Sequence, residues 1–282
     1  MPLDIAHLRS WIGRREVLTD RVTDVPIAAL SATLDRDDPQ PQVGDALPPL
    51  WHWLYFLPLA RQSAIGPDGH PRRGGFLPPV ELPRRMWAGG RFAFHAPLRV
   101  GETITRTSTI ADVTVKEGRT GPLCFVLVRH EVAGADRLAL TEEHDIVYRD
   151  MPPADEPPPR PKPAPTDAVW RRDIVPDPVL LFRYSALTFN GHRIHYDRSY
   201  VTQEEGYPGL IVHGPLIATL LVDLLRRSTD KPLKSFKFRA VSPLFDIAPF
   251  AVCGQPGASG AVALWARNAD GSLAMEAEAI VA

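Results

Sequence analysis

The segment at residues 150–168 constrains the fold most, because DMPPADEPPPRPKPAPTD (150–167) cannot form a regular element. Proline fixes φ and lacks the N–H that a helix interior or a central strand uses, so dense proline favours the extended polyproline II conformation. We therefore interpret this segment as a linker. It separates an N-terminal domain at residues 1–149 from a C-terminal domain at residues 169–282, and both lengths fall within the usual range for domains.

The overall composition argues against several classes of partner. The net charge of -1 and the absence of long like-charge runs give no footprint for nucleic acid or for a membrane surface. Cys124 and Cys253 lie far apart in apolar, strand-like contexts, which fits a reducing compartment. The N-terminus lacks a secretory pattern, and no apolar stretch is long enough to span a bilayer. We expect a cytoplasmic protein.

Hydrophobic patterning predicts a similar order of elements in the two halves. β-branched runs such as FVLVRHEVAG indicate antiparallel strands, and one helix with one curved sheet in each half is an α+β arrangement. For the first half we expect a helix at 3–15, a loop-rich middle at 47–91, and strands at 91–94, 103–116, 122–133 and 137–148. For the second half we expect strands at 180–185, 233–238, 249–253, 261–267 and 273–281.

The clearest helix should follow Gly214, at residues 215–227. Pro215 suits a first helical turn, the run is apolar nearly all round, and two arginines stand at its end, where cations are favoured. Such a helix should be buried against the sheet. A shorter helix is expected to begin at Asp197, as its N-cap, and to continue to about residue 205.

Two neighbouring stretches concentrate polar chemistry, YSALTFNGHRIHYD (184–197) and PGLIVHGPLIATLL (208–221). An imidazole can act as a general base near neutral pH, and a helix start presents free N–H donors. His192, His195 and Asp197 could alternatively bind a metal. We favour a site without metal or cofactor, because Gly191 interrupts the stretch and no confident helix places both imidazoles on one side.

TFNGHRIH (188–195) followed by GLIVHGPL (209–216) resembles the MaoC-like hydratases of the hot-dog fold, whose signature reads approximately S-G-D-x-N-P-[IL]-H. LPPLWHWLYFLP (47–58), IGPDGHPRRGGFLPP (65–79) and LPRRMWAGGRFAF (82–94) are similar to the degenerate N-terminal domain of the 3-methylfumaryl-CoA (mesaconyl-CoA) and itaconyl-CoA hydratase type. The resemblance covers nearly the whole chain. It implies a double hot-dog fold, in which each half is a curved antiparallel sheet wrapped around a central helix and the C-terminal half keeps the catalytic motif.

The resemblance also implies a reaction, the reversible addition of water to an α,β-unsaturated acyl-CoA, with a short branched or dicarboxylic acyl group favoured. His195 would be the general base and acid, and Gly214 would donate a backbone hydrogen bond to the thioester. Asn190 stands where the family has aspartate. An amide has no basic lone pair usable near pH 7, so Asn190 is expected to orient the water.

Further side chains are expected to contact the substrate. Planar guanidinium groups suit CoA phosphates or a distal carboxylate, and aromatic groups suit an acyl pocket. The candidates are Tyr184, at the end of a predicted strand, His213, Arg193, Arg84, Arg85 and Trp87. Two alternatives remain open: a 3-hydroxyacyl-thioester dehydratase of fatty-acid synthesis, and a non-catalytic acyl-CoA-binding module. Hot-dog proteins often pair, so a homo-oligomer is compatible with the resemblance.

Overall fold

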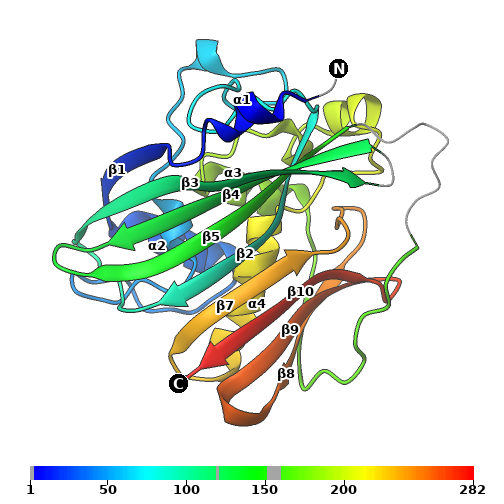
Figure 1. Cartoon of the computed structure of the whole chain (residues 1–282). Helices are drawn as coiled ribbons and strands as arrows, with labels where there is room; N and C mark the ends of the chain where they lie inside the picture. The colour runs from blue at the N-terminus through cyan, green and yellow to red at the C-terminus, as the bar shows by residue number, and fades with distance from the viewer. Residues whose placement is uncertain (1–2, 119–120, 151–159) are drawn as a thin grey trace.

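The computed structural model describes residues 3–118, 121–150 and 160–282, which form one ten-stranded antiparallel sheet (Figure 1). The strand order is β1-β3-β4-β5-β2-β7-β10-β9-β8-β6, so each half of the chain supplies five adjacent strands. The first five are β1 (Arg15–Arg21), β2 (Arg84–Phe94), β3 (Thr103–Gly118), β4 (Gly121–Ala133) and β5 (Leu138–Arg149). The other five are β6 (Trp170–Ile174), β7 (Leu233–Ala240), β8 (Phe250–Pro256), β9 (Ala261–Asn268) and β10 (Leu273–Val281). The predicted α+β class is confirmed.

The two halves join where β2 pairs with β7. Gly89 lies opposite Arg239 and Gly90 lies opposite Phe238 in this antiparallel register. A Cβ atom added at Gly89 would lie 2.6 Å from the carbonyl oxygen of Phe238, which is closer than a carbon can approach without displacing backbone. The Gly-Gly pair is therefore a condition for the two five-stranded units to form one sheet.

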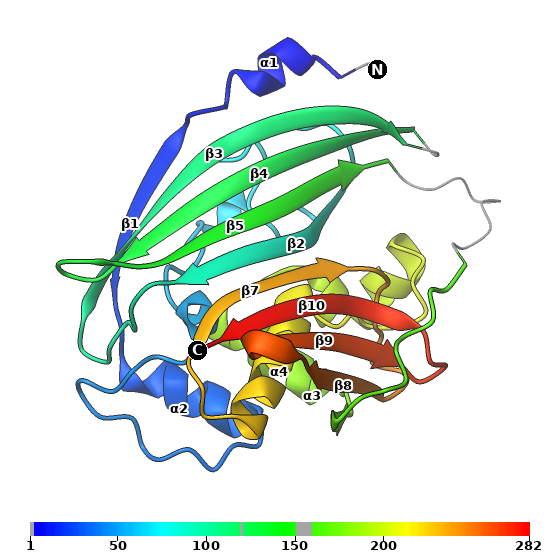
Figure 2. The ribbon, with the colours of Figure 1, turned by 60° about the horizontal axis from the view of Figure 1, so that its bottom comes forward.

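The central helix of the C-terminal half is α4 (Gly214–Ser228), as the sequence predicts. Leu216, Leu220, Leu221 and Val222 are among its buried side chains, and the helix packs against β8, β6 and β9. Figure 2 shows α4 beside α2 and α3 on the inner side of the curved sheet. Because α4 is apolar nearly all round, burial of all its faces favours this position.

In the N-terminal half, shorter elements fill the space that α4 fills in the other half. They are α2 (Asp24–Thr33) and the 3₁₀ turn η1 (Trp51–Leu54). Leu30 and Trp51 belong to the same buried cluster as Phe92 and Ile104 of the sheet, and this cluster continues into α4. A second, smaller core on the outer face of the sheet includes Leu8 of α1 (Ile5–Arg9).

The predicted strand at 180–185 is wrong, because these residues belong to helix α3 (Pro178–Leu187). The side chain of Asp177 accepts a hydrogen bond from the backbone N–H of Leu180, and Pro178 occupies the first turn. An N-cap followed by proline is a strong helix start. A short apolar run does not distinguish helix from strand, so the capping signal decides the structure here.

Two other expectations for the N-terminal half need correction. The helix expected at 3–15 is limited to α1, and residues from Arg15 onward form edge strand β1. Residues 84–90, expected in a loop, are part of β2, whose backbone pairs on both sides. Helix α2 and, in the other half, strand β6 were not predicted.

The proline-rich segment is described in part. Residues 151–159 lie outside the described residues. From residue 160 onward the chain runs along the C-terminal half, where Leu273 N–H donates to the Lys162 carbonyl (2.7 Å) and Ala164 N–H to the Gly271 carbonyl (3.0 Å). Across the described chain, the helices fall short of the length and hydropathy that a membrane span needs.

A buried ion-pair network ties α4 to both halves. The carboxylate of Asp223 is almost fully buried and accepts hydrogen bonds from Arg36 (2.7 Å), Arg172 (2.7 Å) and Arg227 (2.8 Å). Arg36 comes from the N-terminal half, whereas the other two come from the C-terminal half. A buried carboxylate is tolerated only when it is paired and hydrogen-bonded, and Asp223 has three arginine partners that do both.

Replacement of Asp223 by alanine should destabilise the protein by about 3–5 kcal/mol, because it leaves buried guanidinium groups without their counter-charge. Urea unfolding followed by circular dichroism measures this change. The matched control is Asp173→Ala, which removes an exposed ion pair with Arg171 and should leave the midpoint unchanged. An unchanged midpoint for Asp223→Ala would show that the network does not stabilise the junction.

Candidate active site

The polar stretch 188–197 forms a loop between α3 and a short irregular helix. Phe189 adopts a left-handed conformation (φ 49°), which turns the chain sharply after α3. The side-chain oxygen of Asn190 accepts a hydrogen bond from the backbone N–H of His192 at 3.0 Å. Asn190 therefore shapes the loop, and because a carbonyl oxygen accepts two hydrogen bonds, one lone pair remains for a water molecule.

His195 is held in one orientation and one tautomer. It ends the 3₁₀ turn η3 (Arg193–His195), and its ring Nδ1 lies 2.7 Å from the carbonyl oxygen of Ile211. Since a carbonyl oxygen can only accept, Nδ1 must carry the hydrogen, and the basic lone pair is on Nε2. The geometry thus assigns Nε2 of His195 as the atom that can take a proton.

His213 packs against the ring of His195. It is the N-cap residue of α4 and is fully buried, and its ring stacks on that of His195 with centroids 3.7 Å apart and planes at 19°. Its Nε2 lies 2.8 Å from the hydroxyl oxygen of Ser185. Tyr184, on α3, contacts the His213 ring edge to face, with ring centroids 5.1 Å apart, and is itself buried. Tyr184 and His213 thus form the support beneath His195.

Burial keeps these imidazoles neutral. Desolvation lowers the pKa of His195 to about 4, although the hydrogen bond to Ile211 favours the charged form. The pKa of His213 is lowered well below its usual range by burial and by the neighbouring His195. A His195 that is neutral at physiological pH has its Nε2 lone pair available to accept a proton.

Gly214 opens α4 beside the stacked histidines. The first N–H groups of a helix have no partner within the helix, and this end carries positive potential. A Cβ atom added at Gly214 would meet no heavy atom within 4 Å, so the backbone here is open to close approach. Nε2 of His195 can accept a proton, and a backbone N–H at this helix start can donate a hydrogen bond. The two groups lie on neighbouring segments.

Three of the predicted substrate-binding side chains have partners within the protein. The guanidinium of Arg193 binds the carboxylate of Asp197 at 2.7 Å and 3.0 Å. That of Arg84 donates to the backbone carbonyl of Glu205 at 2.9 Å. Trp87 packs on the ring of His144 at 4.0 Å. These side chains therefore stabilise the loop and the sheet junction.

Asp197, His192 and Arg85 lie in or near the same loop. The carboxylate of Asp197 accepts the N–H of Tyr200 at 3.0 Å, which confirms its capping role. The alternative metal set of His192, His195 and Asp197 does not form a ligand cluster among the described residues. Burial is the main cause that lowers the pKa of His192, and the charge of Arg85 adds a smaller effect. Arg85 therefore lies within electrostatic reach of the loop at residues 188–197, which is the candidate catalytic loop.

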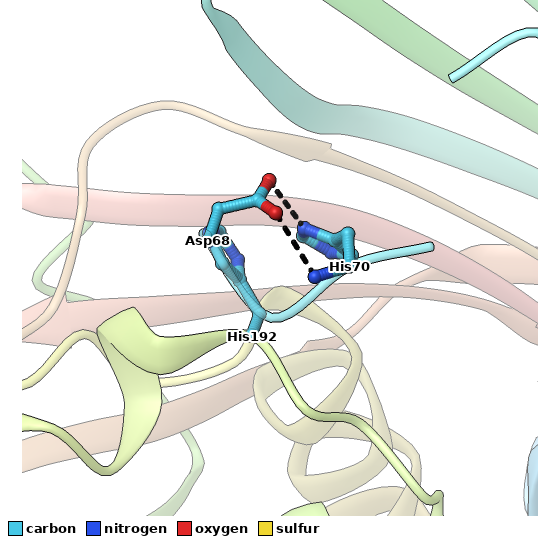
Figure 3. A group of neighbouring side chains, drawn as sticks. All are labelled: Asp68, His70 and His192. Carbon is cyan, nitrogen blue, oxygen red and sulfur yellow. Dashed lines mark hydrogen bonds and ion pairs between the residues drawn. The ribbon is translucent and has the colours of Figure 1, made fainter. Parts of the chain in front are cut away.

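The structure also brings two residues to the site that sequence reasoning missed, Asp68 and His70. The carboxylate of Asp68 lies 3.1 Å from Nδ1 of His70, and the His70 ring is 4.0 Å from that of His192 (Figure 3). Asp68 and His70 both belong to the N-terminal half. The local signal is an aspartate and a histidine two apart in a Gly/Pro-rich turn, and only the fold shows that this turn meets the catalytic loop.

Solved structures with this architecture define the class. A MaoC-like dehydratase from Phytophthora capsici covers 99% of both chains with a TM-score of 0.67 and 13% identity. A Mycobacterium tuberculosis protein described as having a double hotdog fold covers 96% of both chains with a TM-score of 0.58 and 14% identity. These likenesses show the fold, which is the double hot-dog predicted from the sequence.

The chain belongs to the hydroxyacyl-thioester dehydratase type 2 family, whose model matches residues 50–246. It is 50% identical over 274 residues to mesaconyl-C(4)-CoA hydratase of Chloroflexus aurantiacus, which covers 96% of this chain and 97% of that protein. The predicted MaoC-like resemblance is confirmed. The protein is an enzyme, a hydro-lyase of the hydratase/dehydratase type, and the geometry around His195 suits that chemistry.

Substitution of His195 by alanine should lower kcat about a hundred- to ten-thousand-fold, the usual contribution of general acid–base catalysis. Loss of the conjugated-thioester absorbance during hydration of an enoyl-CoA measures this. His95→Ala, which alters an exposed histidine directly after β2, is the matched control and should retain full activity. Near-normal turnover of His195→Ala would remove His195 from the base role.

The lowered pKa of His195 predicts the pH profile of the free enzyme. His195 acts as a base only when neutral, and a pKa of about 4 keeps it neutral across the physiological range. The profile of kcat/KM should therefore lose activity on the acid side only as the pH approaches 4. An acid limb centred near the ordinary histidine pKa of about 6.5 would contradict this assignment.

Proposed function

We propose that the protein reversibly adds water to the double bond of an α,β-unsaturated acyl-CoA, and that its substrate is a short dicarboxylic acyl group such as 3-methylfumaryl (mesaconyl) or itaconyl. The observation that carries this proposal is the pairing of a buried, neutral His195, whose Nε2 is basic, with the open start of α4 at Gly214. The 50% identity with mesaconyl-C(4)-CoA hydratase supports the acyl group.

The hydration step follows from these two groups. The thioester oxygen accepts the N–H of Gly214 at the positive end of α4, which polarises the conjugated system. Nε2 of His195 takes a proton from water while the water oxygen bonds to the β-carbon. The π electrons move onto the thioester as an enolate. The imidazolium of His195 then returns the proton to the α-carbon, so His195 ends the cycle neutral.

The amide at Asn190 is consistent with a dicarboxylic substrate. In a 3-methylfumaryl thioester the distal carboxylate is attached to the β-carbon, the same carbon that the water attacks. An aspartate at position 190, as in the family signature, would place a second anion beside that carboxylate. Asn190 keeps the loop hydrogen bond to His192 and avoids this repulsion.

The second candidate is dehydration of a 3-hydroxyacyl thioester in fatty-acid synthesis, which the family description favours. Its chemistry is the reverse of the same step, so the site residues do not separate the two functions. The length and charge of the acyl chain do. A long chain needs a deep apolar channel, whereas a short dicarboxylic chain needs polar groups near the β-carbon.

A hydration assay with 3-methylfumaryl-CoA, itaconyl-CoA, crotonyl-CoA and a long-chain enoyl-CoA tests the proposal. We expect the highest kcat/KM with a short dicarboxylic ester. A preference for the long chain would assign the protein to fatty-acid metabolism. Tight binding without turnover of any ester would leave a non-catalytic acyl-CoA-binding module.

Replacement of Asn190 by aspartate tests the charge argument directly. Asn190→Asp preserves the shape of the loop but adds an anion, so kcat/KM for 3-methylfumaryl-CoA should fall about ten-fold or more relative to that for crotonyl-CoA. Asn190→Ala separates loss of the loop bond from gain of charge. An equal change with both esters after Asn190→Asp would contradict the repulsion argument.

A further inference from the structure

A turn from the N-terminal half is fixed directly on the catalytic loop. The turn closes with a bridge between Ile65 and Pro71, and the carbonyl of Asp68 accepts the backbone N–H of Arg193 at 2.9 Å. Gly69 has a φ of +89°, and a Cβ atom added there would lie 1.8 Å from the carbonyl oxygen of Gly191. Only glycine allows the two backbones to meet this closely. The turn therefore has a fixed position relative to the catalytic loop.

The turn places the Asp68–His70 pair next to His192. Hydrogen bonds from the ring and the backbone of His70 hold the pKa of Asp68 well below its usual range, although burial alone would raise it. Asp68 is thus an anion that orients His70 through Nδ1. The His70 ring contacts that of His192 at 4.0 Å (Figure 3), and the His192 ring lies 5.5 Å from that of His195 at 89°.

His192 remains a neutral hydrogen-bond donor in these surroundings. Burial first, and then the charge of His70, lower its pKa to about 2, so one ring nitrogen keeps a hydrogen and the other does not. Its backbone N–H is bound by Asn190, which places its ring next to the residue that replaces the family aspartate. The ring donor therefore lies beside His195, on the side of the loop that the turn covers.

Two guanidinium groups add positive charge around this cluster, which can attract an anion. One nitrogen or oxygen from each of Asp68, His70 and His192 lies within 4.8 Å of the others, a spacing that a metal could use. The negative charge of Asp68 raises the pKa of both His70 and His192, whereas the positive charge of Arg85 lowers the pKa of both and that of Arg73 lowers the pKa of His70. Nearby guanidinium groups repel a cation and attract a carboxylate.

We propose that His192 selects the dicarboxylic substrate by donating a ring hydrogen bond to its distal carboxylate, and that the Asp68–His70 pair of the N-terminal half positions the His192 ring. Arg85 supplies the favourable charge. This inference rests on the proposed function, because the carboxylate that His192 binds is the one attached to the β-carbon. The N-terminal half then determines which acyl group the C-terminal catalytic residues receive.

The sharpest variant is His192→Asn, because asparagine is the residue of the family signature at this position. We expect kcat/KM for 3-methylfumaryl-CoA to fall about ten- to a hundred-fold, the contribution of a hydrogen bond to a charged group, with crotonyl-CoA nearly unaffected. His70→Ala and Asp68→Asn should shift the ratio in the same direction by less. His95→Asn is the matched control. Equal losses with both esters, at an unchanged melting temperature, would overturn the assignment.

A binding measurement separates this inference from the proposed function. Calorimetry with succinyl-CoA and butyryl-CoA, which have no double bond to hydrate, should show tighter binding of succinyl-CoA by the native protein and loss of that preference in His192→Asn. This result is independent of turnover. No preference in the native protein would overturn the inference, and so would activity that EDTA removes and zinc restores, because the cluster would then bind a metal.

Discussion

The pairing of β2 with β7 is the constraint on which the rest of the structure depends. Each half supplies five strands, and Gly89 allows these two strands to approach closely enough to form one sheet. This junction fixes the N-terminal half relative to α4, and the Asp223 network adds a second connection through Arg36. With both connections in place, the turn at residues 65–71 reaches the catalytic loop and stays there.

Burial, more than any nearby charge, keeps the imidazole of His195, the proposed base, neutral. His195 faces a backbone carbonyl through Nδ1 and a neutral imidazole, that of His213, through its ring face. Neither partner is an anion, and the hydrogen bond to Ile211 offsets only part of the cost of charging His195 before substrate binds. In the proposed mechanism, the helix start at Gly214 provides the positive potential that the developing enolate requires. One base and one helix end would then carry the hydration beside the thioester.

The sequence predicted the parts of the fold that have strong local signals. The helix after Gly214 and the long alternating strands were found because their apolar periodicity is sustained over many residues. The apolar run of helix α3 is too short to distinguish a helix from a strand, although Asp177 and Pro178 mark a helix start. The N-terminal half was harder, since its helices α1 and α2 are short and depend on packing against the sheet.

The candidate site was predicted where the motif is continuous and missed where it is assembled by the fold. Asn190, His195 and Gly214 stand within one polar stretch and the helix start that follows it, so residue type and order are enough to propose roles for them. Asp68 and His70 lie more than a hundred residues earlier, and their relation to His192 depends on the sheet junction. The partners of Arg84 and Arg193 are likewise set by the folded loop.

The most direct test of the account is a crystal structure of the protein with succinyl-CoA, a dicarboxylic thioester that cannot be hydrated. The account predicts that the thioester oxygen accepts the N–H of Gly214, that the β-carbon faces Nε2 of His195, and that the distal carboxylate lies within hydrogen-bond distance of His192. A thioester bound away from the start of α4, or a β-carbon out of reach of His195, would contradict it.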